Sequence, residues 1–534
     1  RRHTRSFHVT GVQTCALPIS PMTELGSLAS LGNLQLPEGK KLYVATADIR
    51  DCFYAVNCPI GMSDFFCLRS DITPAEAIFI SNGAWSIEDN TPFVSPCITV
   101  LPMGFSWSFY LIQVLHEQAT MKALGIPRSS LILEGQPAPD VDDKSCLAMP
   151  YCDNVHTMST DPRVCQVGCD DVQEKLTSMG FDLHEETEAS TYCCTLGGVI
   201  DGDKGQVRAS NQRLWRISLA FEYLTFAKVH PALVQKLLGH AMTICVLNRA
   251  GMSVFRRLYD MVEQGGEARY LTDIEREECW NFIGIIPMLF ADLRKPWSTT
   301  VVSTDASPEG YGMCESTLTA KEVRSMGQWN ERWRFRRLPA AEWAPRRRAL
   351  ARDVFGDVRT VIGDANTWDE CQQYSHNDAF PEIPPRFLSP SRWKTVGLGK
   401  WGNTQEHITL KEGRALVLAL RRLSRTSRHR GKRHLVFLDN IALAFAVRKG
   451  RAHTYDMLRV MQQVGSISLA ANLGLSVRWV PSEYNPADGP SRGQIRPGAF
   501  SKDGGPSSNE VKQTASEVSQ ASAQIRKIGR ASCR

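Results

Sequence analysis

The stretch "MPYCDNVHTM", residues 149–158, places an acidic turn, Asp153-Asn154, between two short apolar segments. This pattern predicts a tight hairpin that presents one carboxylate at its tip. An Asp-Asn pair also forms ordinary Asx turns, in which the side chain only closes the turn. The segments on either side of this stretch must therefore decide between a functional hairpin and an ordinary turn.

Segments on both sides of the turn follow a definite order. "KLYVATADIRDCFYAV" (41–56) begins as an apolar strand and reaches Asp48, and "LPMGFSWSFYLIQVL" (101–115) comes next. After the turn, Asp161 can cap a helix and Pro162 suits its first position. Extended segments then follow, so the order is strand, loop, hairpin, helix and strands.

In this order the segments resemble the palm of reverse transcriptases over about residues 41–205. The resemblance implies a ferredoxin-like α/β palm in which Asp48 and Asp153 are the catalytic, metal-binding acids. It identifies the "LG" pair Leu196-Gly197 with the primer-grip element. It further implies these nucleotide-binding residues, of which the first is the aromatic gate against a ribose 2′-hydroxyl: Phe53, Met103 and Gly104.

The chemistry of nucleotidyl transfer explains these residue types. Two divalent cations, Mg²⁺ or Mn²⁺, hold the primer hydroxyl and the leaving pyrophosphate, and such hard cations prefer carboxylate oxygens. Asn154 stands where most relatives carry a second acid, and it offers a carbonyl oxygen without charge. The family's basic fingers are not found before Asp48. We therefore expect an N-terminally truncated, poor polymerase.

The ends and the middle of the chain have their own signatures. Val9–Ile19 and Ile528–Arg534 resemble in-frame translations of sequencing-library adapters, so residues 1–40 are expected to be an adapter-derived or disordered lead. The polar tail, 493–534, is expected to be disordered. Residues 206–295 read as helical, with a capping box at Thr272–Glu275, and by position resemble a thumb and connection.

A second set of acids lies between residues 296 and 492. "TTVVSTDASPEGYGM" (299–313) is a strand that delivers Asp305, and Glu412 lies near the start of an amphipathic helix. A buried strand ends at Asp439, and "NPADGPSR" contains Asp488. Asp439 alone could precede a helix cap and Asp488 alone could be solvated, but the four occur in one order.

This order resembles the RNase H domain of retrotransposons, most closely DIRS-like elements and dinoflagellate-type retroelements. The resemblance implies an RNase H-like mixed sheet and makes all four acids, Asp305, Glu412, Asp439 and Asp488, catalytic metal ligands. The two cations would activate a water and stabilise the leaving 3′-oxygen of the RNA strand. The long gap between Asp305 and Glu412 predicts an insertion at about residues 315–400.

Two segments of this region are strongly basic. Lys321–Arg352 has ten Lys/Arg against three Glu and includes Trp329, Trp333 and Trp343, and Arg421–Arg433 has seven Lys/Arg and no acid. Such segments suit phosphate neutralisation with base stacking, although a solvated basic helix or an exposed loop fits equally well. The nucleic-acid-binding residues predicted here are Arg332, Trp333, Arg334, Arg336, Arg337, Arg428 and Arg430.

Composition bounds these expectations. A hydrophobic content of 43% fits a globular protein, and no apolar run reaches the length of about 18 residues that a membrane span needs. The 16 cysteines are scattered, which favours a reducing compartment, cytoplasm or nucleus, over a disulfide scaffold. The expected partners are an RNA template, a DNA primer, an RNA/DNA hybrid and dNTPs.

Two other functions stay open from the sequence. The chain could be a decayed or domesticated retroelement relic that only binds nucleic acid, and Asn154 gives this reading weight for the palm. An RNA-dependent RNA polymerase-like palm is the second alternative, since an Asp-Asn turn occurs there. Phe53 and the RNase H-like half argue against that alternative.

Overall fold

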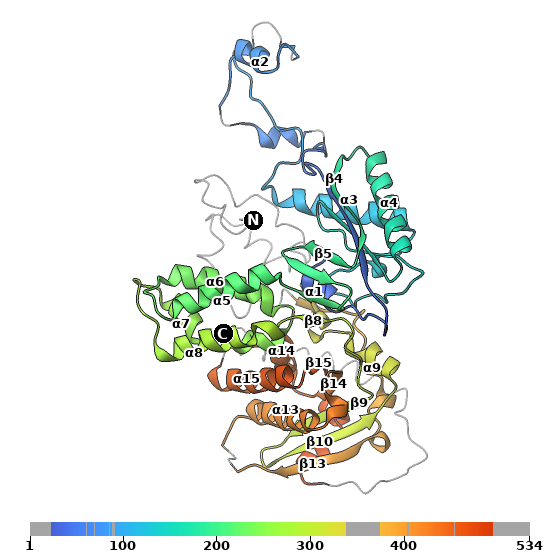
Figure 1. Cartoon of the computed structure of the whole chain (residues 1–534), viewed down its shortest axis with the longest axis vertical. Coiled ribbons are helices and arrows are strands. Elements are labelled where there is room, and N and C mark those ends of the chain that lie inside the picture. The colour runs from blue at the N-terminus through green and yellow to red at the C-terminus, as the bar shows by residue number, and fades with distance from the viewer. Residues whose placement is uncertain are drawn as a thin grey trace, which may run out of the picture.

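The structure is a computed structural model with α/β architecture (Figure 1). Figure 1 shows one sheet with its helices in the upper half, the helices α5–α8 to one side and a second large sheet below. Within the described residues, no helix is long and apolar enough to cross a membrane. The described residues are 23–59, 61–68, 70–84, 86–87, 91–337, 374–402, 405–452 and 454–494.

The upper sheet has the strand order β2-β3-β1-β4, with β1 antiparallel to both β3 and β4. In chain order its elements run βαββαβ, which is the ferredoxin-like arrangement predicted for the palm. The bounds are β1 Tyr43–Ile49, α3 Ser106–Leu124, β2 Leu147–Ala148, β3 Asn154–Ser159, α4 Pro162–Ser178 and β4 Leu183–Ser190.

The second palm helix begins where the sequence predicts. The Asp161 side chain accepts hydrogen bonds from the backbone N–H groups of Arg163 and Val164, which satisfies two free donors of the first turn of α4. A stripe of buried residues, including Val172 and Leu176, packs this helix against the palm sheet. Capping and apolar periodicity therefore agree in placing α4.

An arm leaves the palm between β1 and α3 and reaches away from the body of the molecule (Figure 1). It contains η1 Ser63–Phe66 and α2 Pro74–Ile80, and isolated bridges such as Ile72–Val94 pair its two sides. Before β1, the short helix α1 Leu28–Leu31 packs into the palm core.

A small sheet, order β5-β6-β7-β8, joins the palm to the helical region. The last strand, β8, follows the helices and pairs with β7, so both ends of the helical region meet at this sheet. Phe221, Phe255 and Phe282 contact one another in the helical core. The bounds are β5 Tyr192–Thr195, β6 Gly198–Asp201, β7 Gln206–Arg208, α5 Asn211–Leu224, α6 Pro231–Cys245, η3 Arg249–Ser253, α7 Arg257–Gln264, α8 Asp273–Ile285 and β8 Ala291–Asp292.

The predicted capping box opens α8: the Thr272 side chain accepts from the Glu275 N–H, and the Glu275 side chain accepts from the Thr272 N–H. The helix ends at Ile285, earlier than the sequence indicated, and a turn containing Pro287 follows it. Because proline cannot continue the i→i−4 hydrogen bonding, this early end has a clear physical reason.

The lower sheet is mixed, with the order β13-β10-β9-β14-β15. The strands β9, β10 and β13 are antiparallel neighbours, and β14 is parallel to both β9 and β15. This agrees with the predicted RNase H-like mixed sheet. The bounds are β9 Thr300–Ala306, β10 Gly310–Thr317, β13 Lys394–Lys400, α13 Ile408–Arg425, β14 Arg433–Leu438, α14 Ile441–Lys449, α15 Tyr455–Ala470, β15 Gly474–Trp479 and α16 Asp488–Ser491.

An insertion lies between β10 and β13, as the spacing predicts. Its described parts are α9 Ala320–Gly327, η5 Glu331–Arg334, β11 Phe335–Arg337, β12 Tyr374–His376, η7 Pro385–Phe387 and η8 Pro390–Arg392. The insertion lies along β15, an edge strand of the sheet. Exposed sheet edges invite pairing with other chains, so a covered edge is the stable arrangement.

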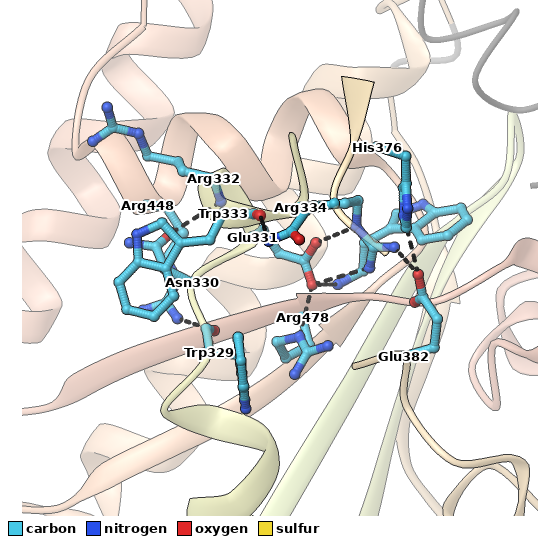
Figure 2. A network of polar contacts seen from close by, with 12 residues as sticks. Trp329, Asn330, Glu331, Arg332, Trp333, Arg334, His376, Glu382, Arg448 and Arg478 are labelled. Carbon is cyan, nitrogen blue, oxygen red and sulfur yellow. Dashed lines mark hydrogen bonds and ion pairs between the residues drawn. The ribbon is translucent and has the colours of Figure 1, made fainter. Parts of the chain in front are cut away.

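A buried carboxylate fixes the insertion to that edge (Figure 2). Glu331 is fully buried, and its oxygens lie 2.7 Å from Arg334 Nε and 2.7 Å from Arg478 Nε of β15. The Trp479 N–H also donates to Glu331, over 3.0 Å. Burial alone would raise the pKa of Glu331, but the two guanidinium groups outweigh it and lower that pKa. The carboxylate is therefore ionised and holds two buried cations.

Removing this charge should destabilise the lower domain. Glu331→Gln leaves Arg478 buried without its ion-pair partner and Arg334 with Glu382 alone, and we expect the free energy of unfolding to fall by about 3–5 kcal/mol. Urea denaturation followed by tryptophan fluorescence measures it, with the exposed Glu483→Gln as control. In the wild type this contribution is present above the ordinary glutamate pKa and is lost as pH falls through the lowered folded value. Equal stability of both variants would contradict the assignment.

Two candidate acidic metal centres

Three of the four acids predicted in the lower domain meet at one point. Asp305 lies near the end of β9, Glu412 in the second turn of α13, and Asp439 directly after β14. One carboxylate oxygen from each lies within 4.8 Å of the other two. The carboxyl groups of Asp305 and Glu412 are buried. The cluster lies at the carboxyl ends of the adjacent parallel strands β9 and β14, where α13 covers the sheet.

Electrostatics at this cluster favours a bound cation. Burial, and next the neighbouring Asp439, raise the pKa of Asp305 to about 7 and that of Glu412 to about 10. Glu412 Oε2 and Asp439 Oδ1 are buried without a hydrogen-bond partner. Unsatisfied carboxylate oxygens that repel one another suit a hard divalent cation such as Mg²⁺ or Mn²⁺. The residues present therefore fit the metal that the resemblance implies.

Asp488, the fourth predicted ligand, lies beside the cluster rather than in it. It begins α16, and its Oδ1 is 2.8 Å from Arg492 Nη2 in an ion pair. Its charge still contributes to raising the pKa of Asp305, although less than burial and Asp439 do. The structure thus brings together three of the four predicted acids, whereas Asp488 forms an ion pair with an arginine one helical turn away.

Asn485 is a positioning residue that sequence reasoning missed. Its amide Nδ2 donates to the Thr304 carbonyl over 3.2 Å and lies 3.4 Å from Asp305 Oδ1. Its Oδ1 accepts from Ser303 Oγ over 2.7 Å. Asn485 thus joins the loop before α16 to the strand that carries Asp305. The string "NPADGPSR" contained the signal, but only its acid was weighed.

The palm acids also come together. Asp48 faces Asn154 in the β1–β3 register, and the Ile49 N–H donates to the Asp153 carbonyl over 2.8 Å. Burial, and next the nearby Asp153 carboxylate, raise the pKa of Asp48, whose Oδ1 is buried without a partner. These two acids could hold a cation between them. The side-chain amide of Asn154 donates to Asp153 Oδ1 over 2.8 Å.

The palm turn is a true two-residue hairpin loop. Tyr151 and Asn154 exchange backbone hydrogen bonds of 3.0 and 2.8 Å, and Cys152 has a φ of +53°. Such positive φ values are what a tight hairpin turn requires, and they are uncommon outside glycine. The expected hairpin with Asp153 at its tip is therefore present.

Two side chains of α3 hold this turn from behind. Gln113 donates to the Pro150 carbonyl over 2.9 Å and accepts from the Cys152 N–H over 2.8 Å. His116 Nδ1 lies 2.8 Å from the Cys152 carbonyl, and burial lowers the pKa of His116 to about 4. A neutral imidazole therefore donates to that carbonyl. Neither residue was predicted; the available signal was a series of polar residues at helical spacing, Gln113, His116, Glu117 and Thr120, all of which are buried.

The predicted nucleotide-binding residues occupy the same end of the palm. Phe53 is half-buried and packs on the core that contains Cys152, whereas Met103 is exposed. Gly104 has a φ of +96° in the loop before α3, and a Cβ there would meet open space. Backbone conformation rather than crowding therefore favours glycine. The Leu196-Gly197 pair forms the β5–β6 hairpin turn, with φ values of +48° and +74°.

The basic residues divide into two groups. Arg334 was predicted to bind nucleic acid, but it is only 2% exposed and pairs with Glu331 and Glu382, so that prediction is wrong. Arg332 is exposed and Trp333 half-buried, and Arg428 and Arg430 are exposed. The side chains of Arg336 and Arg337, and all of Trp343, lie outside the described residues.

The sequence matches no protein-family model and no curated protein. Among solved structures, three foamy viral protease-reverse transcriptase structures are similar. The complex with RNA/DNA hybrid gives 13% identity and a TM-score of 0.36, covering 88% of this chain and 69% of that one. The dRH form in complex with double-stranded DNA gives 10% sequence identity and a TM-score of 0.38, and the alignment covers 87% of this chain and 60% of that one.

The third of these, a further complex with double-stranded DNA, gives 13% identity and a TM-score of 0.38, and the alignment covers 87% of this chain and 72% of that one. These scores are too low to carry a function from those proteins to this chain. The functional argument therefore depends on the residues of the two acidic centres themselves.

Metal binding at the lower centre should release protons. Because burial raises the pKa of Glu412 to about 10 and that of Asp305 to about 7, and bound Mn²⁺ needs ionised carboxylates, we expect roughly one to two protons to leave per bound Mn²⁺. Affinity should rise from pH 6 to pH 8. Calorimetry in buffers of different ionisation enthalpy measures both. Asp439→Asn should lose this binding, whereas Glu483→Gln should keep it; unchanged proton release in Asp439→Asn would refute the site.

Loss of the Gln113 amide should destabilise the palm. Gln113→Leu leaves the buried Pro150 carbonyl and Cys152 N–H without their partner, and we expect a cost of about 1–3 kcal/mol in unfolding free energy. Urea denaturation measures it. Gln118→Leu, an exposed position of the same helix, should change stability by less than about 0.5 kcal/mol. An equal effect of the two variants would contradict the role given to Gln113.

Proposed function

We propose that this chain is an RNA-directed DNA polymerase joined to a ribonuclease H, of the retroelement type. The observation that carries the proposal is the convergence of Asp305, Glu412 and Asp439 from three separate elements of an RNase H-like sheet. The paired acids of the palm, Asp48 and Asp153, support the polymerase half. The "NPADGPSR" string supports assignment to a DIRS-like or dinoflagellate-type element.

The proposal assigns the palm to about residues 41–205, the thumb and connection to 206–295, and the RNase H-like domain to 296–492. The helical core between the two sheets and the return of β8 to β7 support these divisions. Proposed substrates are an RNA/DNA hybrid for the lower centre and dNTPs with a primed template for the palm.

The lower centre would cleave the RNA strand of the hybrid. When bound, divalent cations supply water activation and stabilisation of the leaving 3′-oxygen. The chain's own residues hold the acids in place: the Trp479 indole N–H donates to the Asp439 carbonyl over 2.9 Å, and Asn440 caps α14 immediately after Asp439. Asn485 orients Asp305. The acids are therefore pre-organised, which is what such catalysis requires.

The palm would transfer a nucleotide to a primer end. Asp48 projects from a central strand and Asp153 from a hairpin tip fixed by Gln113 and His116, so both acids are held by backbone that is itself buried. His184 lies next to Asp48, with its Nδ1 3.2 Å from the Asp48 carbonyl; burial and Asp153 raise the pKa of Asp48, and His184 partly opposes that rise. Phe53 beside Cys152 fits a gate that favours dNTPs.

Hybrid cleavage by the full chain tests the proposal. We expect Mn²⁺- or Mg²⁺-dependent cutting of the RNA strand, with no cutting of single-stranded RNA, and a loss of at least about 100-fold in Asp439→Asn. Glu483→Gln is the matched control and should cut like the wild type. Absence of metal-dependent cutting together with salt-sensitive hybrid binding would instead support a non-enzymatic binding relic.

Primer extension on the same preparation tests the palm half. Incorporation of dNTP over NTP that disappears in Asp48→Asn, while hybrid cleavage persists, supports the assignment. Preferential NTP incorporation would favour an RNA polymerase-like palm. Extension that survives Asp48→Asn would remove that acid from the proposed mechanism.

A further inference from the structure

A large cleft lies where the palm, the helical region and the lower domain meet. Its volume is about 1650 Å³, and it is lined by parts of α1, α3, η3, η5, α14 and α15. It shares none of the acids of the two metal centres. The cationic side chains in its wall are Arg128, Arg249, Lys295, Arg324, Arg332, Arg433 and Arg448.

Several of these cations have partners. Arg128 pairs with Glu24 and Glu117, and Arg324 pairs with Asp140. Arg433 donates to backbone carbonyls, among them that of Leu34 over 3.0 Å. By contrast, no carboxylate within the described ranges forms an ion pair with Arg249, Arg332 or Arg448. The cleft wall therefore holds an excess of positive charge at these three residues.

Like charges are forced together at this point. Burial, and next the Arg332 guanidinium, lower the pKa of Arg249, and Arg451 lowers it further, while only Glu134 acts in the opposite direction. Burial lowers the pKa of Arg448 to about 10; the Glu331 carboxylate opposes this shift, and Arg478 and then Arg249 add to it. Arg448 Nε is buried without a hydrogen-bond partner. Arg249 is thus repelled by both Arg332 and Arg448, and within the described residues neither Glu134 nor Glu331 forms an ion pair with any of these three arginines.

The backbone holds the arginines in this arrangement. A Cβ at Gly450, the residue that ends α14 with a φ of +72°, would lie 2.0 Å from the Arg249 carbonyl oxygen. Gly465 of α15 approaches the Ala250 carbonyl in the same way. Only glycine permits such contact, so η3 is fixed against the ends of α14 and α15. The charge cluster is consequently part of a rigid junction.

The insertion supplies the third arginine. In Figure 2, Arg334 points towards the Glu331 carboxylate, whereas Arg332 points away from it. Asn330 caps this turn by accepting from the Arg332 N–H over 3.1 Å, and Arg448 Nη2 donates to the Trp329 carbonyl over 2.7 Å. One short turn thus buries Arg334 as an anchor and exposes Arg332, two residues earlier, to the cleft.

We propose that Arg249, Arg332 and Arg448 form a phosphate-binding site in this cleft. Arginine forks match phosphate oxygens in two parallel charge-assisted hydrogen bonds, and a bound oxyanion would relieve the repulsion among the three groups. The phosphate could belong to a nucleic-acid backbone or to a free anion such as pyrophosphate. The inference does not depend on the proposed enzymatic function, since it concerns binding alone.

A thermal-shift experiment on the full chain tests the site. In EDTA, which keeps divalent cations from both acidic centres, sodium pyrophosphate should raise the melting temperature by at least about 2 °C over sodium chloride of equal ionic strength. The double variant Arg249→Gln/Arg332→Gln should lose this shift. Arg163→Gln, an exposed arginine of α4, should keep it. Arg448 is left intact because it bonds the insertion through Trp329.

The melting temperature of the same variants without added anion provides a second test, because it should not fall. Without added anion and at low salt, the double glutamine variant should melt at or above the wild-type temperature, because repulsion has been removed. Arg249→Lys/Arg332→Lys retains the charge and should retain part of the anion shift. A pyrophosphate shift that persists undiminished in the double glutamine variant overturns the proposal. This holds also if that variant melts below the wild-type temperature when no anion is added.

Hybrid binding distinguishes the two sources of phosphate. If the site holds a nucleic-acid backbone, the slope of log affinity against log salt in EDTA should fall by about two in the double glutamine variant, measured by fluorescence anisotropy. If the slope is unchanged but the pyrophosphate shift is lost, the ligand is the free anion. If neither quantity changes, the three arginines bind no phosphate. Hybrid cleavage by the variant reports separately on the proposed function.

Discussion

Mutual repulsion among Asp305, Glu412 and Asp439 is the constraint on which the lower domain depends. Three carboxyl groups within 4.8 Å in a buried setting oppose folding unless protons or a cation compensate for them. Apolar packing offsets this unfavourable electrostatic energy, since Leu416, Leu420 and Val436 are fully buried between α13 and the sheet. The core therefore forces together the groups that electrostatics would separate, and this is the usual origin of a functional acidic site.

The insertion is connected to that site through few contacts. Glu331 accepts from the Trp479 N–H, and the Trp479 indole donates in turn to the Asp439 carbonyl. The Glu331 carboxylate, which lies at the covered sheet edge, is thus linked to Asp439 through one residue, Trp479. The insertion therefore has two roles here, since it protects an edge strand and it steadies the element that positions Asp439.

The parts of the fold that local chemistry determines were predictable. Asp161 caps α4, the Thr272 box opens α8, and Asp48, Asp305 and Asp439 lie at or next to strand ends, where the apolar runs stop. Partners distant in sequence were not predictable. Arg334 was taken for a nucleic-acid contact although Glu331 lies only three residues away, because the sequence does not show that Arg334 is buried or that Glu382, 48 residues away, also pairs with it. A run of basic letters shows charge, and only the fold shows which charges are already paired.

Gln113 shows the same limit within the palm, since it reads as an ordinary helix residue although it holds a turn 37 residues away.

Asn154 takes a different meaning from its contacts. As an isolated residue it is a weaker metal ligand than an aspartate, but its amide donates to Asp153 Oδ1 over 2.8 Å. A carboxylate in its place would add a third negative charge beside Asp48, whose pKa burial and Asp153 already raise. The Asn154 amide instead restrains Asp153 through a hydrogen bond and adds no further negative charge beside the carboxylates of Asp48 and Asp153. The substitution is therefore compatible with a metal centre built from Asp48 and Asp153 alone.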